Sequence, residues 1–402
     1  MMPNHDILIS ICVPTFNRLF LLERNVNFHL EHFRRLGVSF EIVVVDDCST
    51  DGTDAFLASH AATPELRAYK RVKNSGFLSN YAFAMRRARG RYAVFLGDDD
   101  LLIPEKVIEY VNLMEADASI GVVQAPWLLV DGRAGGGDIG PFYKIPAPVR
   151  IRKSAYVDLV EFILNDHIFP EFMIIRRDVL AQSISGTAPF IFWAFLFTGR
   201  ALDKADILFM PEPFARVTAV SDDPRQQQGN SECMFQWDTY RGGLEYLASN
   251  AWRVMPGPSE LRESFYSRLM RFMLIRQSVA LKLHVQTKNW AEAYILYHRM
   301  AAYQDEPLSP ATMETVRKLA GVTVAANEAI NYADGAVVVD PMLGDDIINL
   351  LPDTMREKLT RTLPSADDPR PTAWLRLDIH FGEPVKDRDG IFDVREYIAQ
   401  FI

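Results

Sequence analysis

The first half of the chain alternates short apolar runs with segments of helical periodicity, and this alternation restricts the folds open to it. The runs at 7–13, 41–47 and 91–96 contain many β-branched or aromatic residues, while 17–36 carries apolar residues at helical spacing. Strands that alternate with helices through short connections are typical of a mostly parallel sheet covered by helices on both faces. We therefore expect an α/β domain over residues 1–220.

Local signals refine this expectation at three places. The first strand is predicted to end at Pro14, and the run at 121–130 is predicted to form one further strand. The segment GGGDIG at 135–140 has the spacing of a dinucleotide-binding glycine motif, but Pro141 and Pro146 follow where a helix would have to open. We interpret that segment as a mobile loop.

The second half of the chain has a different pattern, which begins after a polar stretch at 221–232 that we interpret as a linker. Helical periodicity covers the segments 234–248, 259–283, 290–303 and 345–359. WLRLDIHF, at 374–381, is strand-like. We expect a mainly helical C-terminal domain over 233–402. Its mixed apolar and basic helices leave packing, self-association into a homo-oligomer and contact with a membrane surface open as roles.

Composition and charge exclude several classes of function. The net charge is −9 and no long basic block is present, which argues against nucleic acid as a partner. Three cysteines are too few and too scattered for a disulfide framework, and no secretory signal pattern is visible at the N-terminus. The dense apolar stretch at 189–197 is shorter than a membrane span and is predicted to form a core helix. We expect a cytoplasmic protein, with peripheral association at the inner membrane face as an alternative.

Polar segments follow three of the expected strands, at the edge of the sheet where ligands bind in such folds. Thr15 and Phe16 follow the first strand, Asp47 the second, and Asp98–Asp100 the strand at 91–96. Three adjacent carboxylates repel one another unless a cation such as Mg²⁺ or Mn²⁺ shares them with phosphate oxygens. The alternative is a solvated acidic turn before a helix.

In their order, these segments resemble those of family 2 glycosyltransferases of the GT-A fold. The resemblance covers residues 7 to about 217 and rests on ISICVPTFNR, EIVVVDDCSTDGT, NSGFLSNYAFAMRRARGRYAVFLGDDDLL and MIIRRDVL. It implies a Rossmann-like, mostly parallel sheet flanked by helices. It also implies an enzyme that moves a sugar from a UDP-, dTDP- or GDP-type donor to an acceptor hydroxyl, usually with inversion and with Mn²⁺ or Mg²⁺. The acceptor would be a glycan, a lipid-linked glycan or a small molecule.

The resemblance also implies roles for individual positions. The substrate-binding positions are Pro14, Thr15, Phe16, Asn17, Asp47, Asn74, Gly76 and Asp98. Asp98, Asp99 and Asp100 correspond to the family's D-x-D element and would hold the metal, with Asp99 as the best ligand. Where the family commonly reads F-L-D-x-D-D, this chain has Gly97 at the first acid. The role of each acid in the triplet therefore depends on an alignment that can shift by one residue.

The catalytic base is the main departure from the family pattern. The family often supplies it from an acid that opens a helix after the strand matched by MIIRR, but here that place reads APFIFWAFLFTGR. The nearby candidates are Asp166, His167 and Glu171, which all carry groups able to accept a proton from an acceptor hydroxyl. Two alternatives remain: the base lies elsewhere, or the chain is a catalytically weak or inactive transferase-like nucleotide-binding or scaffold protein.

Overall fold

The computed structural model divides the chain into two compact units. It describes residues 7–184, 191–223, 233–254, 259–303, 310–333, 337–365, 367–368, 370–377 and 389–401. The first unit comprises residues 1–232 and 236–272, and the second comprises residues 233–235 and 273–402. The boundary thus falls within helix α10 (Ser259–Gln286) and not at the polar stretch 221–232, most of which lies outside the described residues.

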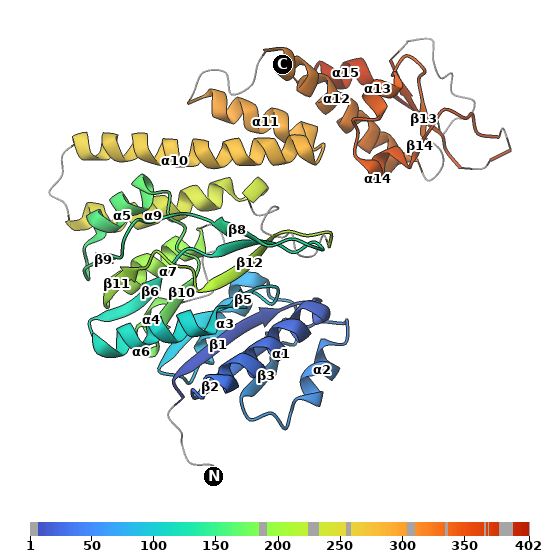
Figure 1. Ribbon diagram of the computed structural model, residues 1–402. Coiled ribbons are helices and arrows are strands. Elements are labelled where there is room, and N and C mark those ends of the chain that lie inside the picture. Colours follow the sequence, from blue (N-terminus) through green and yellow to red (C-terminus); the bar gives the residue numbers. More distant parts are fainter. Residues whose placement is uncertain are drawn as a thin grey trace. The chain divides into compact units, whose positions relative to one another are not determined.

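The first unit contains an eight-stranded sheet with the order β3-β2-β1-β4-β10-β6-β11-β9 (Figure 1). Its strands are β1 (Ile9–Thr15), β2 (Phe40–Asp46), β3 (Leu66–Lys70), β4 (Tyr92–Phe95), β6 (Ile120–Gln124), β9 (Val149–Ile151), β10 (Met173–Arg176) and β11 (Asp206–Phe209). Strand β1 is parallel to β2 and β4, β2 is parallel to β3, and β6 is parallel to β11. Strand β10 is antiparallel to both of its neighbours, β4 and β6. The predicted α/β class is confirmed.

The first strand continues past the proline at which we expected it to end. Pro14 pairs with Val45 of β2 and Thr15 pairs with Asp46, whereas the pairing of β1 with β4 stops at Cys12. The missing N–H of Pro14 therefore interrupts no hydrogen bond between strands, and proline is tolerated there. This extension carries the Thr15 side chain to the edge of the sheet.

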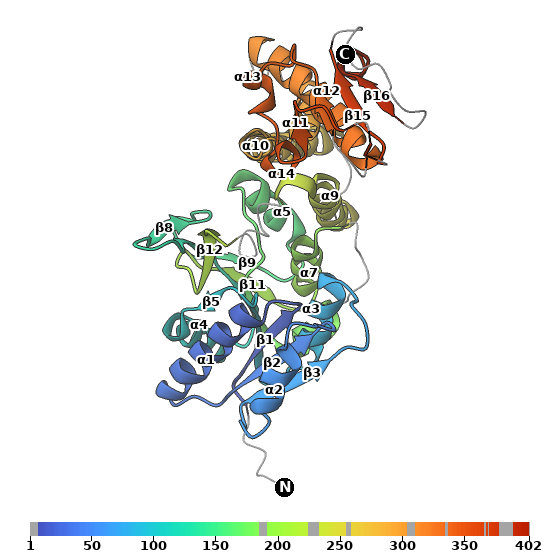
Figure 2. The same ribbon diagram turned by 90° about the vertical axis from the view of Figure 1, so that its right-hand side faces the viewer.

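Helices cover both faces of the large sheet (Figure 2). Helices α1 (Leu19–Arg35) and α4 (Pro104–Ala116) pack on one face, and α3 (Phe77–Arg86), α6 (Arg177–Ser183) and α7 (Trp193–Leu202) pack on the other. Helix α2 (Thr53–Ser59) contacts α1, while α9 (Trp237–Val254) packs against α7 and α5 (Tyr156–Asn165). The described part of the apolar stretch 189–197 leads into α7, whose side chains from Ala194 to Thr198 are buried, as expected of a core helix.

A second, smaller sheet lies beside the first and corrects two predictions. Its order is β5-β12-β7-β8, with β5 (Leu101–Leu102), β7 (Leu128–Asp131), β8 (Asp138–Pro141) and β12 (Ala215–Val220). The run 121–130 is not one strand, because the chain leaves the large sheet after β6, passes Pro126 and enters the small sheet as β7. The interpretation of 135–140 as a mobile loop was wrong for the residues from Asp138 onward, because they belong to β8, which pairs antiparallel with β7.

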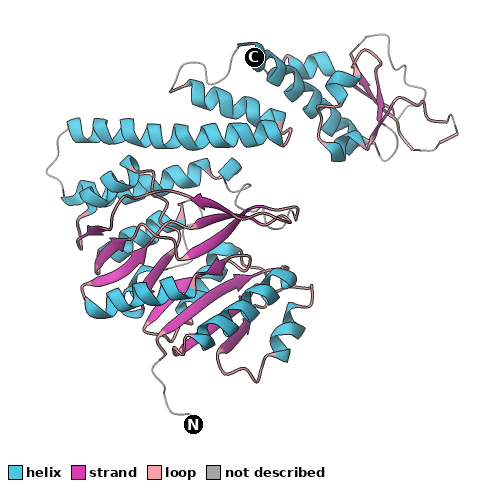
Figure 3. Ribbon diagram, viewed as in Figure 1, coloured by secondary structure: helices cyan, strands magenta, loops and turns pink. Residues whose placement is uncertain are grey.

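The second unit is mainly helical, as expected, but it also holds a four-stranded parallel sheet (Figure 3). Its elements are α11 (Trp290–Ala301), α12 (Pro310–Tyr332), β13 (Val337–Val339), α13 (Asp345–Ile348), α14 (Asp353–Arg356), β14 (Leu359–Thr360), β15 (Ala373–Arg376), β16 (Gly390–Asp393) and α15 (Val394–Ile398). Helix α12 buries Val322, Ala325 and Ala329 against this sheet. Pro352 divides the helix predicted at 345–359 into α13 and α14. The strand-like segment at 374–381 begins within β15, and its residues from 378 onward lie outside the described residues.

The described helices include none with the length and apolar character that crossing a bilayer requires.

Candidate active site

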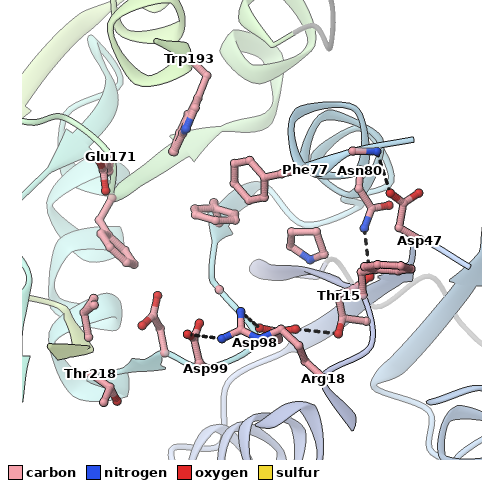
Figure 4. Close-up of a pocket in the computed structure, with 18 of the residues that line it drawn as sticks. Thr15, Arg18, Asp47, Phe77, Asn80, Asp98, Asp99, Glu171, Trp193 and Thr218 are labelled. Atoms are coloured by element: carbon pink, nitrogen blue, oxygen red, sulfur yellow. Dashed lines mark hydrogen bonds and ion pairs between the residues drawn. The ribbon is translucent and has the colours of Figure 1, made fainter. Parts of the chain in front are cut away.

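A cavity of about 350 Å³ opens at the carboxyl ends of β1, β2 and β4 (Figure 4). Its polar lining consists of Thr15, Arg18, Asp47, Asn74, Asn80, Asp98, Asp99, Asp100, Glu171 and Thr218. Its aromatic lining consists of Phe16, Phe77, Phe95, Trp127, Phe172 and Trp193. The three polar segments that follow the expected strands therefore meet around one space, as the parallel pairing of β1 with β2 and β4 requires.

Asp98 is buried and holds two partners from the end of β1. The Thr15 hydroxyl donates to its Oδ2 at 2.7 Å, and the Arg18 guanidinium pairs with its Oδ1 at 2.8 Å. Burial raises the pKa of Asp98 to about 7, while the positive charge of Arg18 acts in the opposite direction. Both carboxylate oxygens of Asp98 are thus engaged by the protein itself.

Asp99 and Asp100 are half-buried at the cavity wall. A second nitrogen of Arg18 pairs with Oδ2 of Asp99 at 2.5 Å. Burial and the neighbouring charges of Asp99 and Asp98 raise the pKa of Asp100 well above its usual range. Arg18 alone therefore does not offset the burial and mutual repulsion that disfavour the charged forms of these acids.

Helix α1 fixes the backbone of the segment that carries the triplet. Arg24 donates to the carbonyl of Asp99 at 2.7 Å, and the amide of Asn25 donates to the carbonyls of Gly97 and Asp100 at 3.0 and 2.8 Å. His29 accepts the backbone N–H of Leu102 at Nε2 and donates from Nδ1 to the carbonyl of Asn25. Burial lowers the pKa of His29 to about 4, so the ring is neutral at physiological pH.

Asp47 organises the loop that precedes α3. Its Oδ2 accepts the backbone N–H groups of Ser75 and Gly76 at 2.8 and 3.0 Å, and Oδ1 of Asn74 accepts the same N–H of Gly76 at 2.9 Å. The other oxygen of Asp47 is buried, accepts no hydrogen bond from any described residue and lies 3.9 Å from Nε of Arg71, with which it forms an ion pair. Gly76 has φ +81°, a conformation that favours glycine. The predicted positions Asp47, Asn74 and Gly76 therefore lie together at the cavity.

Asn80 lies one turn into α3 and presents a second buried acceptor. Its Nδ2 donates to the carbonyl of Val45 at 2.9 Å, whereas its Oδ1 has no hydrogen-bond partner among the described residues. A buried polar atom without a partner costs free energy unless a ligand or water satisfies it. Asn80 and Asp47 thus line this end of the cavity, and each has one buried oxygen that accepts no hydrogen bond from the described residues.

The remaining predicted positions near β1 separate into two groups. Pro14 and Phe16 line the cavity, and the Phe16 side chain is 40% exposed. Asn17 is not part of that lining: its N–H donates to Ser49 Oγ, and its Oδ1 accepts the N–H of Thr50, each at 2.8 Å. Asn17 therefore joins the loops that follow β1 and β2, which places it behind the site and not in contact with the cavity.

The three candidate bases also separate. Glu171 lines the cavity, across from Asp47 and Asn80 in Figure 4. Asp166 is exposed at the C-terminus of α5, and the ring of His167 lies 5.5 Å from that of Phe272. Neither Asp166 nor His167 belongs to the cavity lining. The chain turns at His167, which has a positive φ, before it reaches β10. The structure therefore keeps Glu171 as the candidate that can reach a bound substrate.

An aromatic wall faces the carboxylates. Trp193, at the start of α7, packs against Tyr81 and Phe95 with ring centroids 4.9 and 5.6 Å apart, and Phe77 lies 6.1 Å from it. These contacts place one Trp193 surface in the core, while the side chain also lines the cavity. The site thus combines an apolar wall with a few convergent polar groups, which is typical of small-molecule sites.

Comparison with known sequences decides the identity of this part of the chain. Residues 10–182 match the family model described as glycosyl transferase family 2. The match contains β1 to β4, the loop held by Asp47, the acidic triplet and Glu171. This segment is a glycosyl transferase family 2 domain.

Similar proteins align with parts of this chain. TuaG of Bacillus subtilis, which is provisionally named as a teichuronic acid biosynthesis glycosyltransferase, is 32% identical over 114 residues, or 28% of this chain and 44% of TuaG. The abequosyltransferase RfbV of Salmonella typhimurium is 29% identical over 117 residues, or 28% of this chain and 34% of RfbV. The chain thus spans less than half the length of these two relatives. Among solved structures, S. aureus TarS 1–349 in complex with UDP-GlcNAc has a TM-score of 0.49 at 17% identity, covering 79% of this chain and 86% of that one.

The family 2 domain offers oxygen ligands that fit a hard divalent cation. A β-carbon placed on Gly97 would lie 2.8 Å from Oδ2 of Asp100 and 3.0 Å from Oδ1 of Asp99, so two carboxylate oxygens converge on the space that glycine leaves free. No group of three or more His, Cys, Asp or Glu side chains within the described ranges is arranged to hold a metal. A cation here would need further oxygens from a ligand, as Mg²⁺ commonly does with substrate phosphates.

Four residues that line the cavity were not predicted from the sequence. Arg18 directly follows the segment PTFN at the end of β1, and Asn80 follows Gly76 by one helical turn, so both had a local signal. Trp193 and Thr218 had none, because they come from α7 and from β12 in the second sheet. Only the folded chain brings them to the same cavity as the triplet.

Proposed function

We propose that the protein transfers a sugar from a nucleoside diphosphate donor to an acceptor hydroxyl group. The proposal is carried by the convergence of Asp47, Asn80 and the Asp98–Asp100 triplet on one cavity within a glycosyl transferase family 2 domain. Nucleotides bind at this edge of open α/β sheets. The name of TuaG, which refers to teichuronic acid biosynthesis, favours a glycan as the acceptor.

The nucleoside is proposed to bind between Asp47, Asn80 and Phe16. The carboxylate of Asp47, whose Oδ1 lies 3.9 Å from Nε of Arg71, and the side-chain oxygen of Asn80 would turn to accept hydrogen bonds from N–H groups of the base or O–H groups of the ribose. The half-exposed ring of Phe16 provides a face on which a base can stack. A donor of the UDP, dTDP or GDP type meets these requirements.

The diphosphate is proposed to lie at the triplet, where Asp99 and Asp100 would hold Mn²⁺ or Mg²⁺. Such a cation neutralises charge that develops on the departing diphosphate. Thr15 and Arg18 keep the carboxylate of Asp98 in place beside the other two acids. The aromatic wall around Trp193 limits the access of water to the opposite side of the cavity.

Glu171 is proposed as the base of an inverting transfer. Its carboxylate would take the proton of the acceptor hydroxyl while the acceptor oxygen bonds to the anomeric carbon and the bond from that carbon to the diphosphate breaks. A single displacement of this kind inverts the configuration at that carbon. Glu171 suits the role because it lines the same cavity as the triplet but lies across the space from the proposed nucleoside site (Figure 4).

Calorimetry and donor hydrolysis test the proposal. We expect UDP, dTDP or GDP to bind the full chain with Mn²⁺, and the matching nucleotide sugar to release its diphosphate slowly into water. Glu171→Gln should retain nucleotide binding but lose about 100-fold in turnover, within the usual range for a general base. Glu105→Gln, at an exposed position of α4, should leave both unchanged.

Two results would count against the proposal. If no nucleotide binds a folded sample, the site is not a nucleotide-sugar site. If a nucleotide binds but no donor is turned over by the unmodified chain, the alternative of an inactive transferase-like binding protein is favoured.

A further inference from the structure

Arg18 occupies an unusual place for a basic residue in a site that must bind a cation. Its guanidinium spans two acids of the triplet, with one nitrogen 2.8 Å from Oδ1 of Asp98 and another 2.5 Å from Oδ2 of Asp99. The side chain is 16% exposed and lines the cavity. Two of the three carboxylates therefore already share a positive charge that belongs to the protein.

A guanidinium and a divalent cation compete for the same carboxylates. Arginine stays charged at all accessible pH values, so it cannot relieve the competition by losing a proton. Like charges separated by a few ångströms in a partly buried site repel strongly. A cation can therefore bind closely to Asp98 and Asp99 only if the guanidinium of Arg18 shifts to another anion.

A nucleoside diphosphate supplies that other anion. Guanidinium groups bind phosphate oxygens through paired, charge-assisted hydrogen bonds. Because Arg18 lines the same cavity as Asp47 and Asn80, the diphosphate of a nucleotide held there would come within reach of the guanidinium. The exchange would leave Asp99 free to accept the metal at the moment when the phosphate oxygens arrive.

We propose that Arg18 is a resident counter-ion that keeps the triplet closed to divalent cations until a nucleoside diphosphate binds. This inference rests on the proposed function, because it requires a nucleotide at the same site. It makes metal binding conditional: nucleotide and cation bind together more tightly than either does alone. Arg18 is thus a positioning residue that sets the order of loading.

Helix α1 offers a matched control. Arg24 also contacts the triplet, but it donates to the backbone carbonyl of Asp99 and not to a carboxylate. Replacing Arg24 with glutamine removes one positive charge close to the triplet while Arg18 stays paired with Asp98 and Asp99. Arg18→Lys provides a second comparison, since it keeps the charge but loses the fork that spans two acids.

The test measures binding of Mn²⁺ alone, by electron paramagnetic resonance of the free ion and by calorimetry on the full chain. We expect Arg18→Gln to bind Mn²⁺ about tenfold more tightly than the unmodified chain, as loss of a competing charge-assisted contact predicts. Arg24→Gln should bind Mn²⁺ no more tightly than the unmodified chain, because it leaves Arg18 paired with Asp98 and Asp99. Arg18→Lys should fall between Arg18→Gln and the unmodified chain. Adding UDP, dTDP or GDP should tighten Mn²⁺ binding in the unmodified chain much more than in Arg18→Gln.

The outcomes separate the inference from the proposed function. If Arg18→Gln and Arg18→Lys, folded by circular dichroism, bind Mn²⁺ alone no more tightly than the unmodified chain, the counter-ion role is refuted. If Arg24→Gln gains as much as Arg18→Gln, only general charge matters, and the role is again refuted. If no nucleotide binds any of the proteins, the proposed function fails, while the measurements with Mn²⁺ alone still decide whether Arg18 closes the triplet.

Discussion

The neutral His29 ring predicts a specific loss of stability in acid. In the folded chain, its Nε2 accepts the backbone N–H of Leu102 and its Nδ1 donates to the carbonyl of Asn25. A second proton on the ring would have to bind at Nε2, which would break the hydrogen bond from Leu102. Burial lowers the pKa of His29 to about 4, against an ordinary value of 6.5. Between these values, the unfolded chain binds a proton that the folded chain does not.

The sign and size of the effect follow from this difference. Where the unfolded state binds more protons, the free energy of unfolding decreases as the pH falls. The stability due to neutral His29 is complete above pH 6.5 and is lost progressively as the pH falls towards about 4. At 1.36 kcal/mol for each pKa unit, the loss between pH 7.5 and pH 4.5 is about 2.5 kcal/mol. The loss acts on the contact that anchors the segment after the acidic triplet to α1.

Urea denaturation followed by circular dichroism at pH 7.5 and 4.5 measures this loss. His29→Gln keeps a donor and an acceptor but cannot be protonated, so its free energy of unfolding should decrease by about 2.5 kcal/mol less than that of the unmodified chain over the same interval. Equal losses in His29→Gln and the unmodified chain would refute the reasoning.

Two substitutions test the geometry of the site itself. Gly97→Ala changes no charge, but its methyl group would displace the carboxylates of Asp99 and Asp100. We therefore expect calorimetry to show that Mn²⁺ binding in the presence of nucleotide weakens about tenfold. Gly137→Ala, whose methyl group would meet nothing within 4 Å, should have no effect. Asp47→Asn turns an acceptor of two N–H groups into a weaker one, and it should weaken nucleotide binding by one to two orders of magnitude, or about 1.5–3 kcal/mol. Unchanged affinity in either variant would contradict the assigned geometry.

The sequence was sufficient to predict the strands that position the site, because their apolar runs are buried along their whole length. Strands β1, β2 and β4 fall where these runs predict, and all their residues are buried. Since these three strands are neighbours and run parallel, the acids that follow them had to meet. Asp47 and the Asp98–Asp100 triplet could therefore be placed at one edge before the structure was known.

Features that depend on contacts between distant segments could not be predicted. Pro126 marks a break in an apolar run, but the sequence does not indicate that β7 then pairs with β12, almost ninety residues later. The candidates Asp166, His167 and Glu171 lie within six residues of one another, and a turn with positive φ at His167 decides which of them reaches the cavity. Arg18 was missed because its partners, Asp98 and Asp99, lie 80 and 81 residues away in the chain.

The chain crosses from the large sheet to the small sheet at Ala125 and Pro126, and residues from both sheets line the cavity. The carboxylates stand on the large sheet, whereas Val217 and Thr218 come from β12 in the small one. Under the proposed function, exchanging Val217 or Thr218 would reshape the space for a sugar while leaving the identity of the acids unchanged. Because β12 also pairs with β5, directly after the triplet, larger changes in β12 would reach the acids as well.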